Sequence, residues 1–232
     1  MSQALCISSN ILKDYTLNEK SLLHINYPVG RLASLQTQLL DRKDCETDPT
    51  QLQLIPYITL YDPNICCFFI YQRGQKGTED RLHGRCSMGL GGHIEVQPHA
   101  FGDDLLTVIA KETARELEEE TGLTEQDIPL KKILDNLLSD NFGMIYSHGS
   151  EVDRVHLGIS MIFHVNYQDV RKTEDNVISK GEWLTLGEIY QKIADSEIEV
   201  ENWTKIVLET ISSHLNLNFE VNHAVERIQI AS

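Results

Sequence analysis

A run of carboxylates in the middle of the chain constrains its fold more than any other feature. Residues 115–123 read Arg-Glu-Leu-Glu-Glu-Glu-Thr-Gly-Leu. At about 100° per residue, a helix places Glu116, Glu119 and Glu120 within roughly a quarter of its circumference, while Glu118 points away. Like charges at this spacing repel, so the cluster lowers helix stability unless a cation lies among its oxygens. The run therefore predicts a helix whose acidic edge binds a metal ion.

The neighbouring face of this helix is small and mostly apolar, which suits close packing against a sheet. Its members are Leu106, Ala110, Thr113, Ala114, Leu117 and Thr121. Arg115 lies four residues before Glu119, where an ion pair would orient that carboxylate. Gly122 follows the acids and is expected to end the helix in a left-handed conformation. The sequence thus predicts a short, anchored helix with an acidic outer edge.

The same nine residues resemble the second half of the Nudix box, and they match it at every defined position from Arg115 to Leu123. The family form is a glycine, five residues, a glutamate, seven residues, and then Arg-Glu-aliphatic-any-Glu-Glu-any-Gly-aliphatic. The run 91–95, Gly-Gly-His-Ile-Glu, is similar to the glycine entry of that motif. The first half departs, because Thr107 and Phe101 stand where the family has its glutamate and glycine. Residues that remain open as substitutes for the glutamate are Asp103, Asp104 and Glu112.

The resemblance extends beyond the box, over roughly residues 50 to 190. Segments 53–57, 79–84 and 154–158 look like those of a bacterial Nudix subgroup with a lengthened box. The fold that this resemblance implies is α/β (α+β), a Nudix-like α/β/α sandwich with a mixed β-sheet. We expect residues 51–232 to form this Nudix hydrolase-like domain and residues 1–50 to form an N-terminal extension packed on it.

The resemblance also implies an activity, which is Mg²⁺-dependent cleavage of a phosphoanhydride bond in a nucleoside diphosphate linked to another moiety. Mn²⁺ is the alternative ion, because both are hard cations that prefer oxygen ligands. By this resemblance Glu116, Glu119 and Glu120 bind the metal together with the carbonyl oxygen of Gly92, and Arg115 orients the carboxylates. The general base stays open between residues that the chain offers at four positions, namely Glu119, Glu120, Glu151 and Glu182.

Candidate substrate contacts lie in a polar loop over residues 72–85, which holds the densest run of bases in the chain. Arg73 and Arg81 are expected to face the glycine turn, where a guanidinium can bind phosphate through two hydrogen bonds. His93 lies beside that turn and is either a substrate contact or a packing residue. His156, within an alternating strand, is interpreted as structural. A catalytically inactive nucleotide sensor with the same fold is the alternative function, and a purely structural module is a third.

Composition limits the partners. The chain has 35 acidic and 20 basic residues and a formal charge of −15, so no basic field would hold a nucleic acid. No stretch of about 18 apolar residues occurs, and the first residues lack a basic, then apolar, leader. We therefore expect a cytoplasmic protein that binds a small molecule and neither nucleic acid nor membrane. A homodimer is left open.

Hydrophobic patterns predict the remaining elements. Residues 55–61 and 65–71 are expected to form a hairpin around Asp62-Pro63-Asn64. Residues 87–94 read as a glycine-rich strand, and residues 130–138 and 155–165 as further strands, the second with clear alternation. Apolar residues at helical spacing between Trp203 and Ile211 predict a second helix that closes the core.

Overall fold

A computed structural model describes residues 2–14, 23–25, 35–74, 82–97, 102–139, 143–171 and 178–214. These ranges contain one mixed sheet whose main path runs β10-β5-β4-β9-β8-β2. Its strands are β1 Gln3–Ser8, β2 Leu23–Ile25, β3 Thr37–Asp41, β4 Gln51–Asp62, β5 Cys67–Arg73, β6 Cys86–Ser87, β7 Gly89–Leu90, β8 Gly143–Tyr146, β9 His156–His164 and β10 Ile178–Leu184. The pair β4 and β9 is parallel, and the other pairings are antiparallel.

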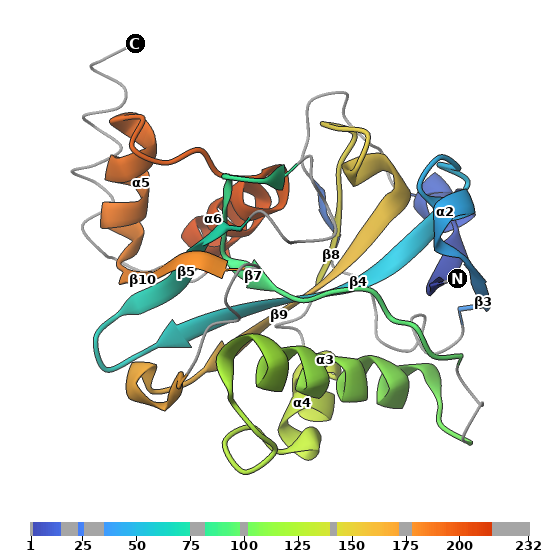
Figure 1. Cartoon of the computed structure of the whole chain (residues 1–232), viewed down its shortest axis with the longest axis horizontal. Coiled ribbons are helices and arrows are strands. Elements are labelled where there is room, and N and C mark those ends of the chain that lie inside the picture. The colour runs from blue at the N-terminus through green and yellow to red at the C-terminus, as the bar shows by residue number, and fades with distance from the viewer. Residues whose placement is uncertain are drawn as a thin grey trace.

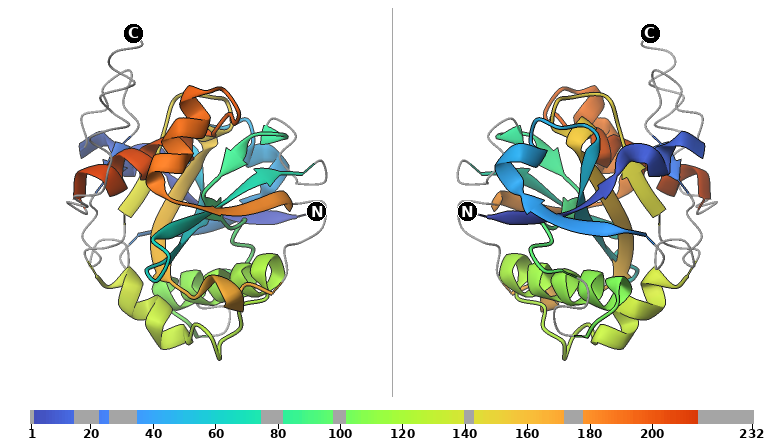
Figure 2. Two further views of the ribbon diagram at one scale, coloured as in Figure 1. Left: turned by 90° about the vertical axis from the view of Figure 1, so that its left-hand side faces the viewer. Right: turned by 90° about the vertical axis from the view of Figure 1, so that its right-hand side faces the viewer.

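Helices cover both faces of this sheet (Figures 1 and 2). They are α2 Arg42–Cys45, α3 Leu105–Thr121, α4 Leu130–Leu137, α5 Leu186–Ala194 and α6 Asn202–His214, with 3-10 turns η1 Ser9–Asp14, η3 Asp153–Val155 and η4 Tyr167–Asp169. One apolar core lies between the sheet and the pair α3 and α4. A second core lies between the opposite face and the pair α5 and α6. The predicted α/β/α sandwich with a mixed sheet is confirmed. No helix in the described ranges is both long and apolar enough to cross a bilayer.

Helix α3 forms as its sequence predicts. Asp104 caps its start by accepting a hydrogen bond from the Thr107 backbone N–H at 2.8 Å. Ala110, Thr113 and Leu117 of the small stripe are buried against the sheet. Gly122 ends the helix with φ 71° and donates its N–H to the carbonyl of Glu118, so the predicted left-handed end is confirmed. These caps fix the rotation of the helix and therefore the direction of its acids.

The predicted strand at residues 130–138 is wrong, because this segment forms helix α4. Its apolar residues Leu130, Ile133, Leu134 and Leu137 have the i, i+3, i+4, i+7 spacing of a helix, and Ile133 and Leu137 are fully buried. The glycine-rich strand predicted at residues 87–94 forms only in part, as β6 and β7, because the chain leaves the sheet after Leu90. The hairpin, the strand near residues 155–165 and the second helix form as predicted. Strands β4 and β5 form the hairpin, β9 covers residues 156–164, and α6 is the second helix.

The start of the chain contributes directly to the sheet. Strand β1 pairs with β3 and with the first residues of β4, and β2 pairs with β8. Further along the same edge of β4, strand β7 pairs with Ile58 and Thr59. The segment that follows β7 separates from β4 at Gly91. Further along this segment, the carbonyl of Ile94 accepts a hydrogen bond from the Leu5 N–H of β1. The division of the chain at residue 50 stays a prediction.

Candidate active site

Two buried carboxylates of α3 face the glycine segment after β7. The side chains of Glu116 and Glu120 are buried, whereas Glu119, between them in sequence, is exposed. One oxygen of Glu120 accepts a hydrogen bond from the Gly91 N–H at 3.1 Å. A carboxylate oxygen of Glu116 lies against Gly92. The structure therefore brings Gly92, Glu116 and Glu120 together, as the sequence predicts.

Both glycines lie in close contact with their neighbours. A Cβ at Gly91 would lie 1.9 Å from the carbonyl oxygen of Pro56 on β4, and the φ of 141° disfavours any other residue. A Cβ at Gly92 would lie 2.6 Å from Oε1 of Glu116. Gly91 is therefore needed for the close approach to β4, and a side chain at position 92 would displace the carboxylate of Glu116. The close approach leaves main-chain polar groups beside the acids, which is the arrangement that a metal site with a carbonyl ligand needs.

Arg115 holds three carboxylates with one guanidinium. It donates to Glu112 at 2.9 Å, to Glu119 at 2.7 Å and to Glu116 at 2.5 Å. These carboxylates raise the pKa of Arg115 above its usual value, although partial burial opposes them. The orienting role expected for Arg115 agrees with this geometry. Three negative charges around one positive charge leave an excess that a divalent cation would offset.

Glu116 is buried beside this excess of negative charge. Burial is the main cause that raises the pKa of its carboxyl to about 7; the charge of Glu119 acts in the same direction, and Arg115 acts in the opposite direction. A cation bound beside this carboxyl would favour its charged form. The acids therefore offer hard oxygen donors in a place where positive charge is lacking.

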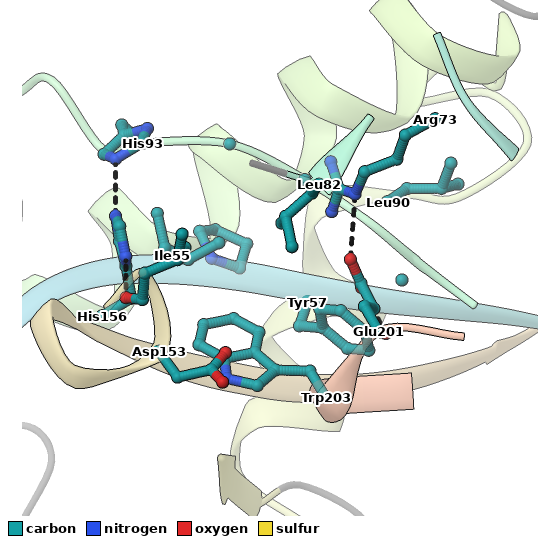
Figure 3. A pocket seen from close by; sticks show the side chains of 15 residues that line it. Ile55, Tyr57, Arg73, Leu82, Leu90, His93, Asp153, His156, Glu201 and Trp203 are labelled. Atoms are coloured by element: carbon teal, nitrogen blue, oxygen red, sulfur yellow. Dashed lines mark hydrogen bonds and ion pairs between the residues drawn. The ribbon is translucent and has the colours of Figure 1, made fainter. Parts of the chain in front are cut away.

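A cavity of about 110 Å³ lies on the other side of the glycine segment, and Gly91 and Gly92 form part of its wall. Figure 3 shows its side chains. Ile55, Tyr57, Leu82 and Trp203 give it apolar and aromatic surfaces, and its polar lining comes from Arg73, His93, Asp153, His156 and Glu201. The ring of Trp203 meets that of Tyr57 edge to face at 5.5 Å. The indole N–H of Trp203 is buried, and no described residue accepts a hydrogen bond from it.

Arg73, predicted as a phosphate contact, lines this cavity and is held by Glu201. Its Nε donates to Glu201 at 2.9 Å (Figure 3). The same carboxylate accepts hydrogen bonds from the hydroxyls of Tyr57 at 3.1 Å and Ser87 at 2.5 Å. Arg81, the second predicted phosphate contact, lies outside the described residues. The proposed roles of both arginines stay predictions.

His93 and His156 meet at the far end of the cavity. Their Nε2 atoms are 3.1 Å apart, and Nδ1 of His156 is 2.7 Å from the carbonyl oxygen of Val152 (Figure 3). Burial, together with the charge of Arg42, lowers the pKa of His93 to about 2, so its ring is neutral. The alternating strand pattern indicates a structural role for His156, and no local sequence signal indicates its pairing with His93.

The structure also separates the candidates for the general base. Glu182 pairs with Lys180 at 2.5 Å and with Lys192 at 3.7 Å, and it lines a different depression of the surface. Glu151 is exposed in a turn before η3. Neither residue lines the cavity beside the glycines. Sequence reasoning missed Glu201, Tyr57 and Asp153 as cavity residues, because nothing in their local patterns distinguishes them from core or cap positions.

Comparisons with known proteins bear on the fold. No family model matches the chain. Protein YmaB of Bacillus subtilis (strain 168) is 28% identical over 188 residues, which cover 78% of this chain and 84% of YmaB. The crystal structure of Tm1382, provisionally assigned to the Nudix hydrolases, superposes with a TM-score of 0.64 at 23% identity and covers 90% of this chain and 97% of Tm1382. A NUDIX hydrolase from Alicyclobacillus acidocaldarius reaches a TM-score of 0.46 at 14% identity, over 68% of this chain and 90% of its own. The superposition on Tm1382 and the geometry around Arg115 agree with the resemblance seen in the sequence: this chain has the Nudix fold.

Proposed function

We propose that the protein is a divalent-metal-dependent hydrolase that cleaves a phosphoanhydride bond in a nucleoside diphosphate linked to another moiety. The observation that carries the proposal is the glycine segment, which has buried Glu116 and Glu120 on one side and an aromatic cavity on the other. A diphosphate that reaches the acids through a metal ion would be close enough to place its organic part in the cavity. The acidic surface elsewhere argues against a longer polyanionic substrate.

Glu116, Glu119 and Glu120 would hold Mg²⁺ or Mn²⁺ together with the carbonyl oxygen of Gly92. Carboxylate and carbonyl oxygens are the donors that both ions prefer. When bound, the ion supplies charge neutralisation of the phosphates and a water of lowered pKa. The residues of the chain do the positioning. Arg115 orients the carboxylates of Glu116 and Glu119 by donating a hydrogen bond to each, and the Gly91 N–H donates to Glu120.

The cavity would receive the part of the substrate that is not phosphate. Tyr57 and Trp203 offer aromatic surfaces against which such a group can pack. Arg73 is positioned by Glu201 at the entrance to this space. Glu201 neutralises the charge of Arg73. The guanidinium would therefore orient a bound phosphate through hydrogen bonds more than attract it by charge.

The experiment is a turnover assay of the purified full chain with Mg²⁺ or Mn²⁺. The panel comprises nucleoside triphosphates, dinucleoside polyphosphates, NADH, ADP-ribose and nucleotide sugars. We expect metal-dependent hydrolysis of at least one diphosphate derivative. The variant Glu120→Gln should lower kcat by about 10²-fold or more, because it removes a proposed ligand. The matched control is Glu118→Gln, which changes an exposed residue of the same helix and should retain full activity. Absence of turnover on the whole panel would count against an enzyme.

A nucleotide sensor without catalysis is the second candidate. Two observations support it. Thr107 stands in place of the family glutamate, and its N–H donates to the capping side chain of Asp104. Arg115 also holds Glu119 in an ion pair. Calorimetry separates the two functions. Binding of a nucleotide in the presence of Mg²⁺, with no product after prolonged incubation, would favour the sensor.

A further inference from the structure

A second cluster of metal-ligating side chains lies apart from the α3 acids. Glu46 at the end of α2, His93 after β7 and His156 at the start of β9 bring their ligand atoms within 4.8 Å of one another. No other group of three such side chains in the described ranges meets this distance. The three residues come from distant parts of the sequence and are positioned by strand pairing, so their meeting is a property of the fold.

The two imidazoles have the orientation of metal ligands. A carbonyl oxygen can only accept a hydrogen bond, so Nδ1 of His156 is protonated and donates to the carbonyl of Val152. Nε2 of the same ring then has the lone pair. A metal-ligating histidine usually has this kind of backbone partner on its second nitrogen. The two Nε2 atoms are 3.1 Å apart. An ion about 2.0–2.1 Å from each would subtend an angle of about 100°, within the range of tetrahedral sites distorted by the protein.

Glu46 adds a carboxylate to the two imidazoles. Its Oε1 accepts from Nε of Arg42 at 3.4 Å, and both side chains are partly buried. An outer partner of this kind orients a ligating carboxylate. Two imidazoles and one carboxylate form a ligand set that suits Zn²⁺ and related transition metals, whereas Mg²⁺ prefers oxygen alone.

A buried amide beside the cluster provides an independent indication of a missing polar group. Gln53 has no exposed surface, and neither its Oε1 nor its Nε2 has a hydrogen-bond partner among the described residues. It is the register partner of His156 across the parallel pair β4 and β9, so both side chains lie on the same face of the sheet. Leaving a buried amide unsatisfied is costly, and a metal-bound water would satisfy it.

We infer that Glu46, His93 and His156 bind a divalent transition-metal ion of the Zn²⁺ class, at a site separate from the α3 carboxylates. Three protein ligands leave a coordination position for water or substrate. His93 and His156 both line the cavity, so this position opens into it. The site would add a second ion to the same cavity that the proposed function uses, and it stands without that function.

The test uses Co²⁺ as a spectroscopic substitute for Zn²⁺. The full chain, without a histidine tag and stripped of metal with EDTA, is titrated with Co²⁺ in excess Mg²⁺. We expect visible d–d absorption that saturates at one equivalent and is displaced by Zn²⁺. His93→Gln and Glu46→Gln should each weaken Co²⁺ binding by more than about tenfold. Both residues are partly exposed. Far-UV circular dichroism shows whether each variant is folded, and the binding result is taken from the folded variants.

Two controls make the result specific. His148→Gln removes an exposed imidazole elsewhere and should leave the titration unchanged. Glu120→Gln removes an α3 carboxylate and should also leave it unchanged, even where hydrolysis is lost. A plain hydrogen bond between the two histidines predicts no visible absorption, and that outcome would overturn the inference. Absorption that survives in folded His93→Gln, or that disappears in Glu120→Gln, would overturn it as well, because the ion would then lie elsewhere.

Discussion

Two buried glutamates, each paired with an arginine, lie on opposite sides of the glycine segment and differ in how their charge is compensated. Glu201 has Arg73 at 2.9 Å and two hydroxyl donors, from Tyr57 and Ser87. Glu116 shares Arg115 with Glu112 and Glu119. One pair is complete within the protein, and the other is short of positive charge.

This difference in charge compensation indicates a structural role for Glu201 and an ion-binding role for Glu116. A carboxylate with its own guanidinium and hydroxyl donors has no electrostatic need for an added ion, so the Glu201 pair shapes the cavity. A carboxylate that shares one arginine with two other carboxylates gains from a divalent ion. The same residue types at similar burial therefore serve different roles, and the number of acids around each arginine decides which.

The largest effect on stability is expected from Glu201→Gln. The glutamine keeps the shape but leaves Arg73 without its counter-ion, and removing one partner of a buried pair costs about 3–5 kcal/mol. We expect the lower end of that range, because Arg73 keeps 23% of its side chain exposed. Urea unfolding measures the change. Glu199→Gln is the matched control, since Glu199 pairs with Arg85 at the surface and should change stability by less than about 1 kcal/mol.

Glu116→Gln should have the opposite sign in metal-free protein. The pKa of Glu116 is raised from 4.5 to about 7, so the folded chain binds this proton more tightly than the unfolded chain. The resulting stabilisation is fully present below pH 4.5 and is lost as the pH rises through 7, by roughly 3 kcal/mol at most. Urea unfolding in EDTA between pH 4.5 and 8 should show this loss in the wild type and a smaller one in the variant. Equal pH dependence in both would show that Glu116 is already compensated.

The sequence predicts contacts between residues that lie close together in the chain better than contacts between distant residues. The acids of α3 and Arg115 lie within two helical turns, so the helical period places them together without further knowledge. The Glu201 pair joins residues 128 positions apart, and the pairing of His93 with His156 spans 63 positions. No local period relates such residues. Strand order brings them together, and that order follows from the packing of the whole chain.

The wrong prediction at residues 130–138 has a different cause. A short apolar run is ambiguous between strand and helix, and the choice depends on which spacing is counted. Ile133 and Leu137 are four residues apart and both reach the core beneath the sheet, which requires a helix. Helix α3 already occupies the neighbouring space, so α4 completes the layer on that side.

Arg115→Lys tests how one guanidinium serves three carboxylates. The fork of Arg115 donates through Nε, Nη1 and Nη2, whereas an ammonium group is a single point charge on a flexible stem. We expect metal-dependent kcat to fall by about tenfold, which corresponds to about 1.4 kcal/mol. Stability should change by less than about 1 kcal/mol, because Arg115 is 41% exposed. Unaltered kcat would mean that the orientation of the acids does not limit catalysis.

The smallest effect on stability is expected from Gly92→Ala, yet it reports most directly on the proposed metal site. The added methyl meets Oε1 of Glu116 at 2.6 Å, and that oxygen is the end of a flexible side chain, so it can move at a cost of about 1 kcal/mol or less. The movement displaces the carboxylate from the glycine carbonyl. Mn²⁺ affinity, followed by calorimetry, should therefore fall although unfolding changes little. Gly187→Ala adds a methyl where no atom lies within 4 Å and should alter neither Mn²⁺ affinity nor activity. Unchanged Mn²⁺ binding in Gly92→Ala would separate Glu116 from the metal and leave it, like Glu201, a structural charge.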